Sequence, residues 1–484
     1  MTASVPSSSN TTRLPVGPQP VPSRPAVALA LACVGVFVII LDATIVSVAL
    51  PHIGADLRFG RSSVAWVVNA YTLAFGGALL VAGRLVANHG TRFGFLTGVG
   101  CFGIASLACG LAPTAWVLVA ARALQGLAGA LVMPATLTMA TAAYPDERRR
   151  ARALGLWSAV GAAGGAAGTV AGGLLTDLAG WRWVFLVNVP ITLAAVLGGP
   201  RVLAAGRSGS TRARLDLPGA ALATAGLVAL VYGVLDGGTD GWSGARVVAS
   251  LTAAVVLLGL FLIHLHRWTS APLVPPRLFR SRHVSTANAV IFCLGLGFFA
   301  SPVLLSLYLQ DALGYSPLRA GLAFLPAAAA LFVGAQTAGQ LTHRFGVRTV
   351  ATGGALGAVA GFGWLTQLSD HTSYWPGLVL PQLLFGLGIG TAFTPITLAA
   401  TAVPPALAGV AAGVLNTVRQ VAAALGLAIL STLATSQPGD PATGYDQAFL
   451  IATCTALVAA AVAALLLPQR PAAPPSTASD RSAP

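Results

Sequence analysis

The chain has 484 residues, of which 56% are hydrophobic and only 8% are charged, whereas a soluble domain carries roughly 25% charged residues. Its formal net charge is +14, all 27 basic residues are arginine, and Glu147 is the only glutamate. This composition excludes a water-soluble enzyme, and the missing lysine excludes a lysine-dependent phosphate loop or a pyridoxal Schiff base. The arginines are scattered between apolar stretches, so we expect no nucleic-acid partner.

Fourteen mostly apolar stretches follow one another along the chain, each near the length of about 20 residues that crosses a hydrocarbon core. We therefore predict an all-α membrane protein. The predicted spans are 26–50, 63–83, 94–112, 115–140, 154–176, 184–204, 218–236, 247–265, 286–310, 319–340, 349–368, 376–400, 408–433 and 446–467. The tails, 1–25 and 468–484, are rich in Ser, Thr, Ala and Pro and are predicted to be disordered.

The arginines are distributed unevenly between the loops that alternate along the chain. The even-numbered loops and the two tails hold 20 of the 27, the odd-numbered loops hold 5, and Arg122 and Arg419 lie within spans. Cytoplasmic loops accumulate positive charge. We therefore predict that both termini lie in the cytoplasm, and the lysine-free, Ala- and Gly-rich composition is typical of a bacterium with a GC-rich genome. The predicted location is thus the bacterial cytoplasmic membrane.

A loop motif occurs twice in the chain. Gly83, Gly90 and Arg92 follow the second span, and Gly339, Gly346 and Arg348 follow the tenth, each displaced by 256 positions. This repeat predicts two six-helix bundles, 26–204 and 286–467, with two further helices inserted at 218–265. Repeated bundles of this kind are a transporter architecture, in which the substrate path lies between the repeats.

Several longer runs strengthen this interpretation. They are LDATIVSVALP at 41–51, WVVNAY at 66–71, RALQGLAGA at 122–130, WRWVFLVNVP at 181–190, YLQ at 308–310 with GYSP at 314–317, and LNTVRQ at 415–420. Together they resemble the signatures of the major facilitator superfamily, and within it the fourteen-helix branch of drug:proton antiporters. The resemblance implies the major facilitator fold, here two six-helix bundles plus two additional central helices.

The chain departs from the family pattern at three places. The loop motif normally carries an acid and then a base where this chain has Ala87 and Asn88, and its second copy has His343 in place of the acid. Both changes question the charged cytoplasmic latch that the family uses in switching. The fifth-helix motif has Thr169 in place of a proline, but its glycines are retained, and we group these with the loop motifs as switching elements: Gly164, Gly168 and Gly172.

Asp42 is the only acid well inside a predicted span, about eight residues or roughly 12 Å from the outer end. Arg122 lies at a comparable depth in the fourth span, so the two side chains can meet. A charge in hydrocarbon is costly unless it is paired or hydrated. The family associates its fourth-helix motif with proton transfer, and we interpret Asp42 and Arg122 as the proton-coupling pair, in which Arg122 alters the proton affinity of Asp42. The alternative is a static ion pair that orients two helices.

Four further polar residues within spans are candidates for the substrate cavity: Asn69, Gln125, Asn416 and Arg419. Arg419 either balances an anionic substrate group or binds backbone carbonyls, and Asn69 either contacts substrate or forms a bond between helices. We find no paired catalytic carboxylates, no GxSxG turn and no ligand-spaced His/Cys cluster, so we expect neither an enzyme nor a bound metal or cofactor.

The resemblance and the embedded acid together predict a proton-coupled efflux antiporter. It would export small, largely apolar drugs or antibiotics by alternating access, with a small molecule, protons and the lipid bilayer as its partners, and it would act as a monomer. Two alternatives remain open: a proton symporter that imports a small molecule, and a membrane sensor or scaffold of the same fold that transports nothing.

Overall fold

The computed structural model describes residues 24–60, 63–144, 146–203, 215–269, 274–369, 371–435 and 441–469, and every element in these ranges is a helix. Most of the two tails predicted to be disordered, 1–25 and 468–484, falls outside the described residues.

The helices form three groups in chain order. The first group comprises α1 (Pro25–Asp56), η1 (Ser63–Ala65), α2 (Trp66–His89), α3 (Thr91–Gly110), α4 (Ala115–Ala142), α5 (Glu147–Ala179), α6 (Trp183–Leu186) and α7 (Asn188–Val202). The inserted group comprises α8 (Leu217–Asp240), α9 (Ala245–Ile263) and η2 (His264–Trp268). The last group comprises η3 (Pro276–Arg280), α10 (Arg282–Leu307), η4 (Tyr308–Ala312), α11 (Pro317–Ala323), α12 (Leu325–Phe345), α13 (Val347–Trp364), η5 (Leu365–Gln367), η6 (Tyr374–Leu378), α14 (Val379–Ala400), α15 (Pro405–Thr435) and α16 (Pro441–Leu466).

Thirteen helical segments in the described part of the chain are long and apolar enough to cross a membrane. The predicted eleventh span corresponds to α13, which has 18 residues, five of them glycine, and is consequently less hydrophobic than the others. It packs against α14 and α16 as a full member of its bundle. The fourteen predicted spans are therefore all helical.

Two predicted spans each consist of two helices separated by one residue, which the apolar pattern did not indicate. The backbone at that residue keeps helical φ and ψ angles, so each span continues across it. The sixth is divided between α6 and α7 at Val187, and the tenth between α11 and α12 at Phe324. Each division lies just before a proline, Pro190 or Pro326. A proline has no N–H to donate to the carbonyl four residues earlier, so the helix is weakest there.

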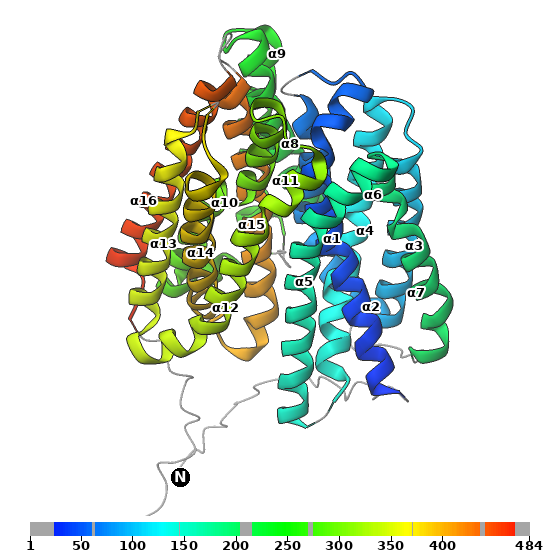
Figure 1. Cartoon of the computed structure of the whole chain (residues 1–484). Helices are drawn as coiled ribbons and strands as arrows, with labels where there is room; N and C mark the ends of the chain where they lie inside the picture. Colours follow the sequence, from blue (N-terminus) through cyan, green and yellow to red (C-terminus); the bar gives the residue numbers. More distant parts are fainter. Residues whose placement is uncertain are drawn as a thin grey trace, which may run out of the picture.

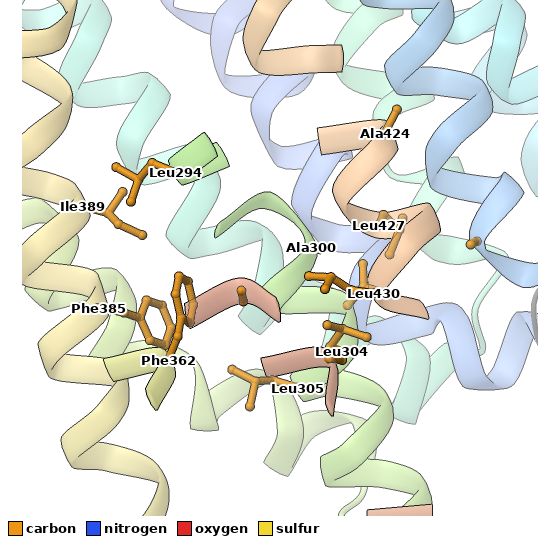
Figure 2. Packing of buried hydrophobic residues seen from close by; sticks show 14 of the residues in the cluster. Leu294, Ala300, Leu304, Leu305, Phe362, Phe385, Ile389, Ala424, Leu427 and Leu430 are labelled. Carbon is orange, nitrogen blue, oxygen red and sulfur yellow. The ribbon is translucent and has the colours of Figure 1, made fainter. Parts of the chain in front are cut away.

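The helices before and after the inserted pair form two bundles that lie side by side, and Figure 1 shows α1–α7 on one side and α10–α16 on the other. Apolar side chains fill the interior of each bundle. In the second bundle, Figure 2 shows Leu304 of α10 and Leu430 of α15 on one side of the core and the stacked pair Phe362–Phe385 on the other. Helix α8 of the inserted pair packs against α2 and against α15, so it contacts both bundles.

The described arginines gather at one end of the bundles. We call the end where α1 begins the arginine-rich side and the other end the opposite side.

On the opposite side, α5 packs tightly on α11: a Cβ on Gly321 would lie 2.5 Å from the carbonyl oxygen of Thr169. Gln310 also donates from Nε2 to the carbonyl of Val48 over 2.9 Å, which joins η4 to α1. The two bundles are thus closed against each other on the opposite side.

Candidate functional site

The two charges predicted to meet inside the first bundle do so. Nη1 of Arg122, on α4, lies 2.6 Å from Oδ2 of Asp42, on α1, and both residues are fully buried. Each charge alone in an apolar interior would be strongly unfavourable, whereas a close, hydrogen-bonded pair compensates most of that cost. The contact therefore explains how the acid is accommodated in the middle of α1.

Two amide side chains complete the surroundings of the Asp42 carboxylate. Gln125 donates from Nε2 to Oδ1 over 2.8 Å, and Asn188 at the start of α7 donates to the same oxygen over 2.9 Å. Gln125 also accepts from Arg122 Nη1 over 2.7 Å through Oε1, and its Nε2 lies 2.8 Å from Ser106 Oγ. Asp42 thus receives hydrogen bonds from three side chains on two further helices, which is the arrangement of an ionised carboxylate.

The guanidinium of Arg122 is held on all sides as well. Its Nε donates to the carbonyl of Val67 over 2.9 Å, and its carbon lies 4.3 Å from the ring centre of Tyr71 and 5.6 Å from that of Phe185. The rings cover the cation with apolar, electron-rich surface. In this conformation the pair is therefore sealed from both ends of the bundles.

Sequence reasoning located part of this cluster and missed the rest. Asp42 and Arg122 were predicted to meet, whereas Gln125 was predicted as a cavity residue and is instead buried and bonded to both. The role of Asn188 was not predicted, although it lies in one of the family-like runs. The available signal was a polar residue inside the sixth span, two residues before Pro190. Asn69, a predicted cavity residue, is fully buried on α2, and neither atom of its amide has a hydrogen-bond partner among the described residues.

The other two cavity candidates, Asn416 and Arg419, lie in the second bundle and do not join the Asp42 cluster. Asn416 donates to the carbonyl of Ala412 within its own helix, α15. The guanidinium carbon of Arg419 lies 4.6 Å from the ring centre of Phe393 on α14, and its buried Nε has no hydrogen-bond partner in the described part of the chain. The structure thus separates a compensated charge pair from a single cation.

Exposure along the Arg419 face of α15 changes from one side of the molecule to the other. Residues spaced three or four apart share a helical face. On this face Arg419 and Ala423 are partly exposed, whereas Gly426 and Leu430, nearer the opposite side, are buried. Helix α14 shows no such gradient: Phe393 is partly exposed, but Ile389 before it and Ile396 and Ala400, nearer the arginine-rich side, are buried. Among the described residues, α4 makes at most marginal contact with α14 and α15.

The two loop motifs adopt the same backbone conformation. Gly90 and Gly346 have φ angles of 92° and 86°, values that glycine adopts without strain. The second copy is bound to the end of α16: Arg348 donates from Nε to the carbonyl of Leu467 over 2.6 Å, and the Val347 N–H donates to the carbonyl of Gln469. The repeat seen in the sequence is therefore also a repeat of local structure.

In the first loop copy, where Ala87 and Asn88 replace the expected charges, an acid from elsewhere lies nearby. Asp216 of the inserted group interacts electrostatically with Arg84 of the motif. The same carboxylate caps α8 through the Gly219 N–H at 3.0 Å and lies 2.7 Å from Nε2 of His264. The inserted group thus brings a carboxylate into the electrostatic surroundings of this loop, and the ion pair of that carboxylate is with His264.

The glycines predicted to take part in switching line the contact between α5 and α1. A Cβ on Gly164 would lie 3.0 Å from the carbonyl of Phe37, one on Gly168 2.8 Å from that of Leu41, and one on Gly172 would clash with that of Ile45. These positions let two backbones approach closely. Close packing is therefore their observed role.

With this geometry in hand, comparison with known proteins is informative. The family description "Major Facilitator Superfamily" matches residues 32–427 and, in a second match, 290–484. The chain is 40% identical over 454 residues to "Cephamycin export protein CmcT" of Amycolatopsis lactamdurans, which covers 92% of this chain and 93% of that protein. It is 38% identical to "Puromycin resistance protein pur8" of Streptomyces alboniger, covering 91% of each chain.

A third relative is the "Tetracenomycin C resistance and export protein" of Streptomyces glaucescens, 34% identical over 86% of this chain and 77% of that one. Among solved structures, the xylose transporter XylE from E. coli superimposes with a TM-score of 0.63 at 14% identity, covering 92% of this chain and 97% of that one. The nucleoside transporter NupG gives 0.60 at 13% identity, with 90% and 98% covered. At such low identity these structures show the shared fold alone.

Proposed function

The chain belongs to the major facilitator superfamily, and we propose that it is an efflux antiporter that exports a small, largely apolar drug or antibiotic in exchange for protons. The observation that carries this proposal is similarity over nearly the whole chain to relatives named for antibiotic export or resistance. The sealed Asp42–Arg122 pair supports proton coupling, because it places one titratable acid inside the first bundle.

We assign the conformation to the inward-facing state of an alternating-access cycle. In this assignment the arginine-rich side faces the cytoplasm, as the distribution of positive charge favours. Closure of α5 on α11 supports it, as does the increase in exposure toward the arginine-rich side along the Arg419 face of α15. Substrate then enters from the cytoplasm or the inner leaflet and occupies the space between the bundles.

In the proposed cycle, Asp42 is ionised and paired with Arg122 while the protein faces inward. When the bundles reorient, α1 and α4 shift relative to each other, the pair separates and Asp42 is hydrated from outside. The carboxylate then takes up a proton as the substrate leaves, and the return step restores the Arg122 contact and releases that proton inward. The close packing of α5 glycines on α1 supports such a motion, since small residues leave a smooth surface for one helix to move on the other.

The proton gradient is sufficient to drive such a cycle. One charge moved across about 100 mV yields roughly 2.3 kcal/mol, and one pH unit adds about 1.4 kcal/mol. One proton can therefore sustain a substrate gradient of a few hundredfold. The protein would act as a monomer in the bacterial cytoplasmic membrane, because one chain contains both bundles and the path between them.

Everted membrane vesicles with an acidified lumen test this function. Adding a transported drug should collapse the pH gradient, because drug entry into the lumen is exchanged for protons that leave it. A symporter would not release luminal protons when drug is added outside. A sensor or scaffold would give no drug flux in reconstituted liposomes under any gradient, and that result would refute the proposal.

A further inference from the structure

The most unusual charge in the described part of the chain is Arg419. It lies fourteen residues from the first residue of α15 and sixteen from the last, which is about 21 and 24 Å along the helix. The described acids of the second bundle, Asp311 and Asp446, lie in η4 and near the start of α16, both toward the opposite side. No hydrogen bond or ion pair to Arg419 is present among the described residues, so its positive charge in the membrane interior is uncompensated.

The contacts of Arg419 leave its donors available. Phe393 covers the face of the guanidinium at 4.6 Å, and stacking on a ring leaves the N–H groups at the edges free to donate. Nε is buried, but the residue is partly exposed and its two Nη groups are not among the buried unpaired atoms, so the edge that they form can bind both oxygens of a carboxylate. Asn416, one turn away, already donates to the carbonyl of Ala412 and does not compete for such a ligand.

An aromatic surface extends from this cation. The ring centre of Phe393 lies 5.5 Å from that of Phe298 and 6.2 Å from that of Phe299, both on α10. All three rings are partly exposed rather than buried in the core. Together with Arg419 they form an amphipathic surface that has a single positive charge at one end and apolar rings at the other.

Phe393 shares a helical face with the buried Gln382, Gly386 and Ile389. The outward leucines of α14 lie on a different face: Leu384, Leu387 and Leu398. The surface is therefore directed into the protein.

We propose that Arg419, Phe393, Phe298 and Phe299 form a subsite for an amphipathic organic carboxylate, in which the guanidinium binds the carboxylate and the rings hold the apolar body. This inference rests on the proposed efflux function and specifies the class of its substrate. A single positive charge matches a singly ionised acid. Arg122 of the first bundle does not serve as a second cation for a more highly charged ligand, because Asp42 already neutralises it.

A matched pair of fluorescent probes tests the subsite: pyrenebutyrate, which carries a carboxylate, and pyrenebutanol, which has the same rings and no charge. Binding to the purified full-length chain in nanodiscs should favour pyrenebutyrate by about tenfold, the effect of a charge-assisted hydrogen-bonded pair. Arg419→Gln should remove this preference and leave the affinity for pyrenebutanol unchanged. Arg419→Lys, which retains the charge but not the planar donor edge, should retain part of it.

The control variant is Arg319→Gln. Arg319 is also stacked on an aromatic ring, that of Tyr315 at 3.9 Å, but it lies on α11 at the opposite side. This variant should keep the full preference for the carboxylate. Equal affinities of the wild-type protein for the two probes, including binding of neither, would overturn the proposal, and so would an unchanged preference in Arg419→Gln. If the wild-type protein prefers pyrenebutyrate but exchanges no protons for it, the subsite stands and the antiport function fails.

Discussion

Asn188 donates to Oδ1 of Asp42 over 2.9 Å and thereby joins the sixth span to the first. Asn188 is the first residue of α7, and Val187 before it keeps helical φ and ψ angles, so the amide faces the carboxylate from within a continuous span. Together with Gln125 and Arg122 it surrounds the acid with donors. Any movement that hydrates Asp42 must therefore break contacts to α4 and to α7, so the carboxylate is coupled mechanically to two helices of its bundle.

Replacing the acid should abolish coupling without preventing folding. Asp42→Asn keeps the size of the side chain and removes its ionisation, so drug-dependent proton release in vesicles should fall to background. Membrane insertion should be retained. The matched control is Asp56→Asn, which affects an exposed ion pair with Arg182. Such pairs contribute only about 0–1 kcal/mol, so this variant should transport normally. Full activity of Asp42→Asn would remove the acid from the mechanism.

Breaking the buried pair from the other side should destabilise the protein. Arg122→Gln leaves the Asp42 carboxylate without its counter-charge, and removal of one partner of a buried pair costs about 3–5 kcal/mol. The apparent Tm in detergent should therefore drop clearly. The double variant Asp42→Asn with Arg122→Gln leaves two neutral groups and should recover much of the loss. A double variant less stable than Arg122→Gln alone would contradict the assignment of an ion pair.

Cys109 can report whether water reaches the cluster. Its Sγ lies 3.6 Å from Oε1 of Gln125, and the residue is fully buried. In a variant that retains Cys109 and has the other four cysteines replaced by alanine, a small thiol reagent should react slowly at rest. The rate should rise several-fold during transport at low external pH, when the cluster is hydrated. Equal protection under both conditions would mean that Asp42 stays dry, and proton coupling would then need another acid.

The contact between α5 and α1 should not tolerate an added methyl group at its tightest points. Gly168→Ala would place a Cβ against Thr44 and the carbonyl of Leu41, so the helices must separate or the protein loses stability and transport. Gly155→Ala on the same helix is the control, since a Cβ there meets no atom within 4 Å. Alanine is also the better helix former by about 1 kcal/mol, so the control should be at least as stable as the wild type. Transport assays and Tm measurements on both variants distinguish the outcomes.

The sequence predicted the fold and one part of the site for a clear physical reason. An apolar stretch of about 20 residues is the length that crosses the hydrocarbon core as a helix, and every predicted span is helical. Asp42 and Arg122 lie at equal depth in their spans, and this was enough to predict their contact. The divisions at Val187 and Phe324 were missed because apolar periodicity is insensitive to a proline inside a long span. Asn188 was missed because the apolar pattern does not show which face of the sixth span packs against α1.

Contacts between residues that are far apart in the sequence could not be predicted from local sequence patterns. The electrostatic interaction of Arg84 with Asp216 depends on how the inserted helices pack on α2, and nothing in the local sequence around Ala87 indicates it. The stacking of Arg419 on Phe393 likewise joins two helices of the second bundle that are separated by a loop. A local motif shows which residues share one face of a helix. Which other helix that face contacts can be seen only in the packed structure.

The two bundles meet along two flanks of the molecule, and the inserted pair covers only one of them. The bundles meet along α2 and α15 on one flank and along α5 and α11 on the other, and α8 packs on both α2 and α15. Thr224 of α8 lies against Gly77 of α2, and Thr432 of α15 donates to the carbonyl of Val234 in α8. Lipid-dissolved molecules that diffuse in the plane of the bilayer therefore meet a covered wall on the first flank. Among the described residues, the inserted helices make at most marginal contact with α5 and α11, so the inserted pair covers one of the two lines along which the bundles meet and leaves the other facing lipid directly.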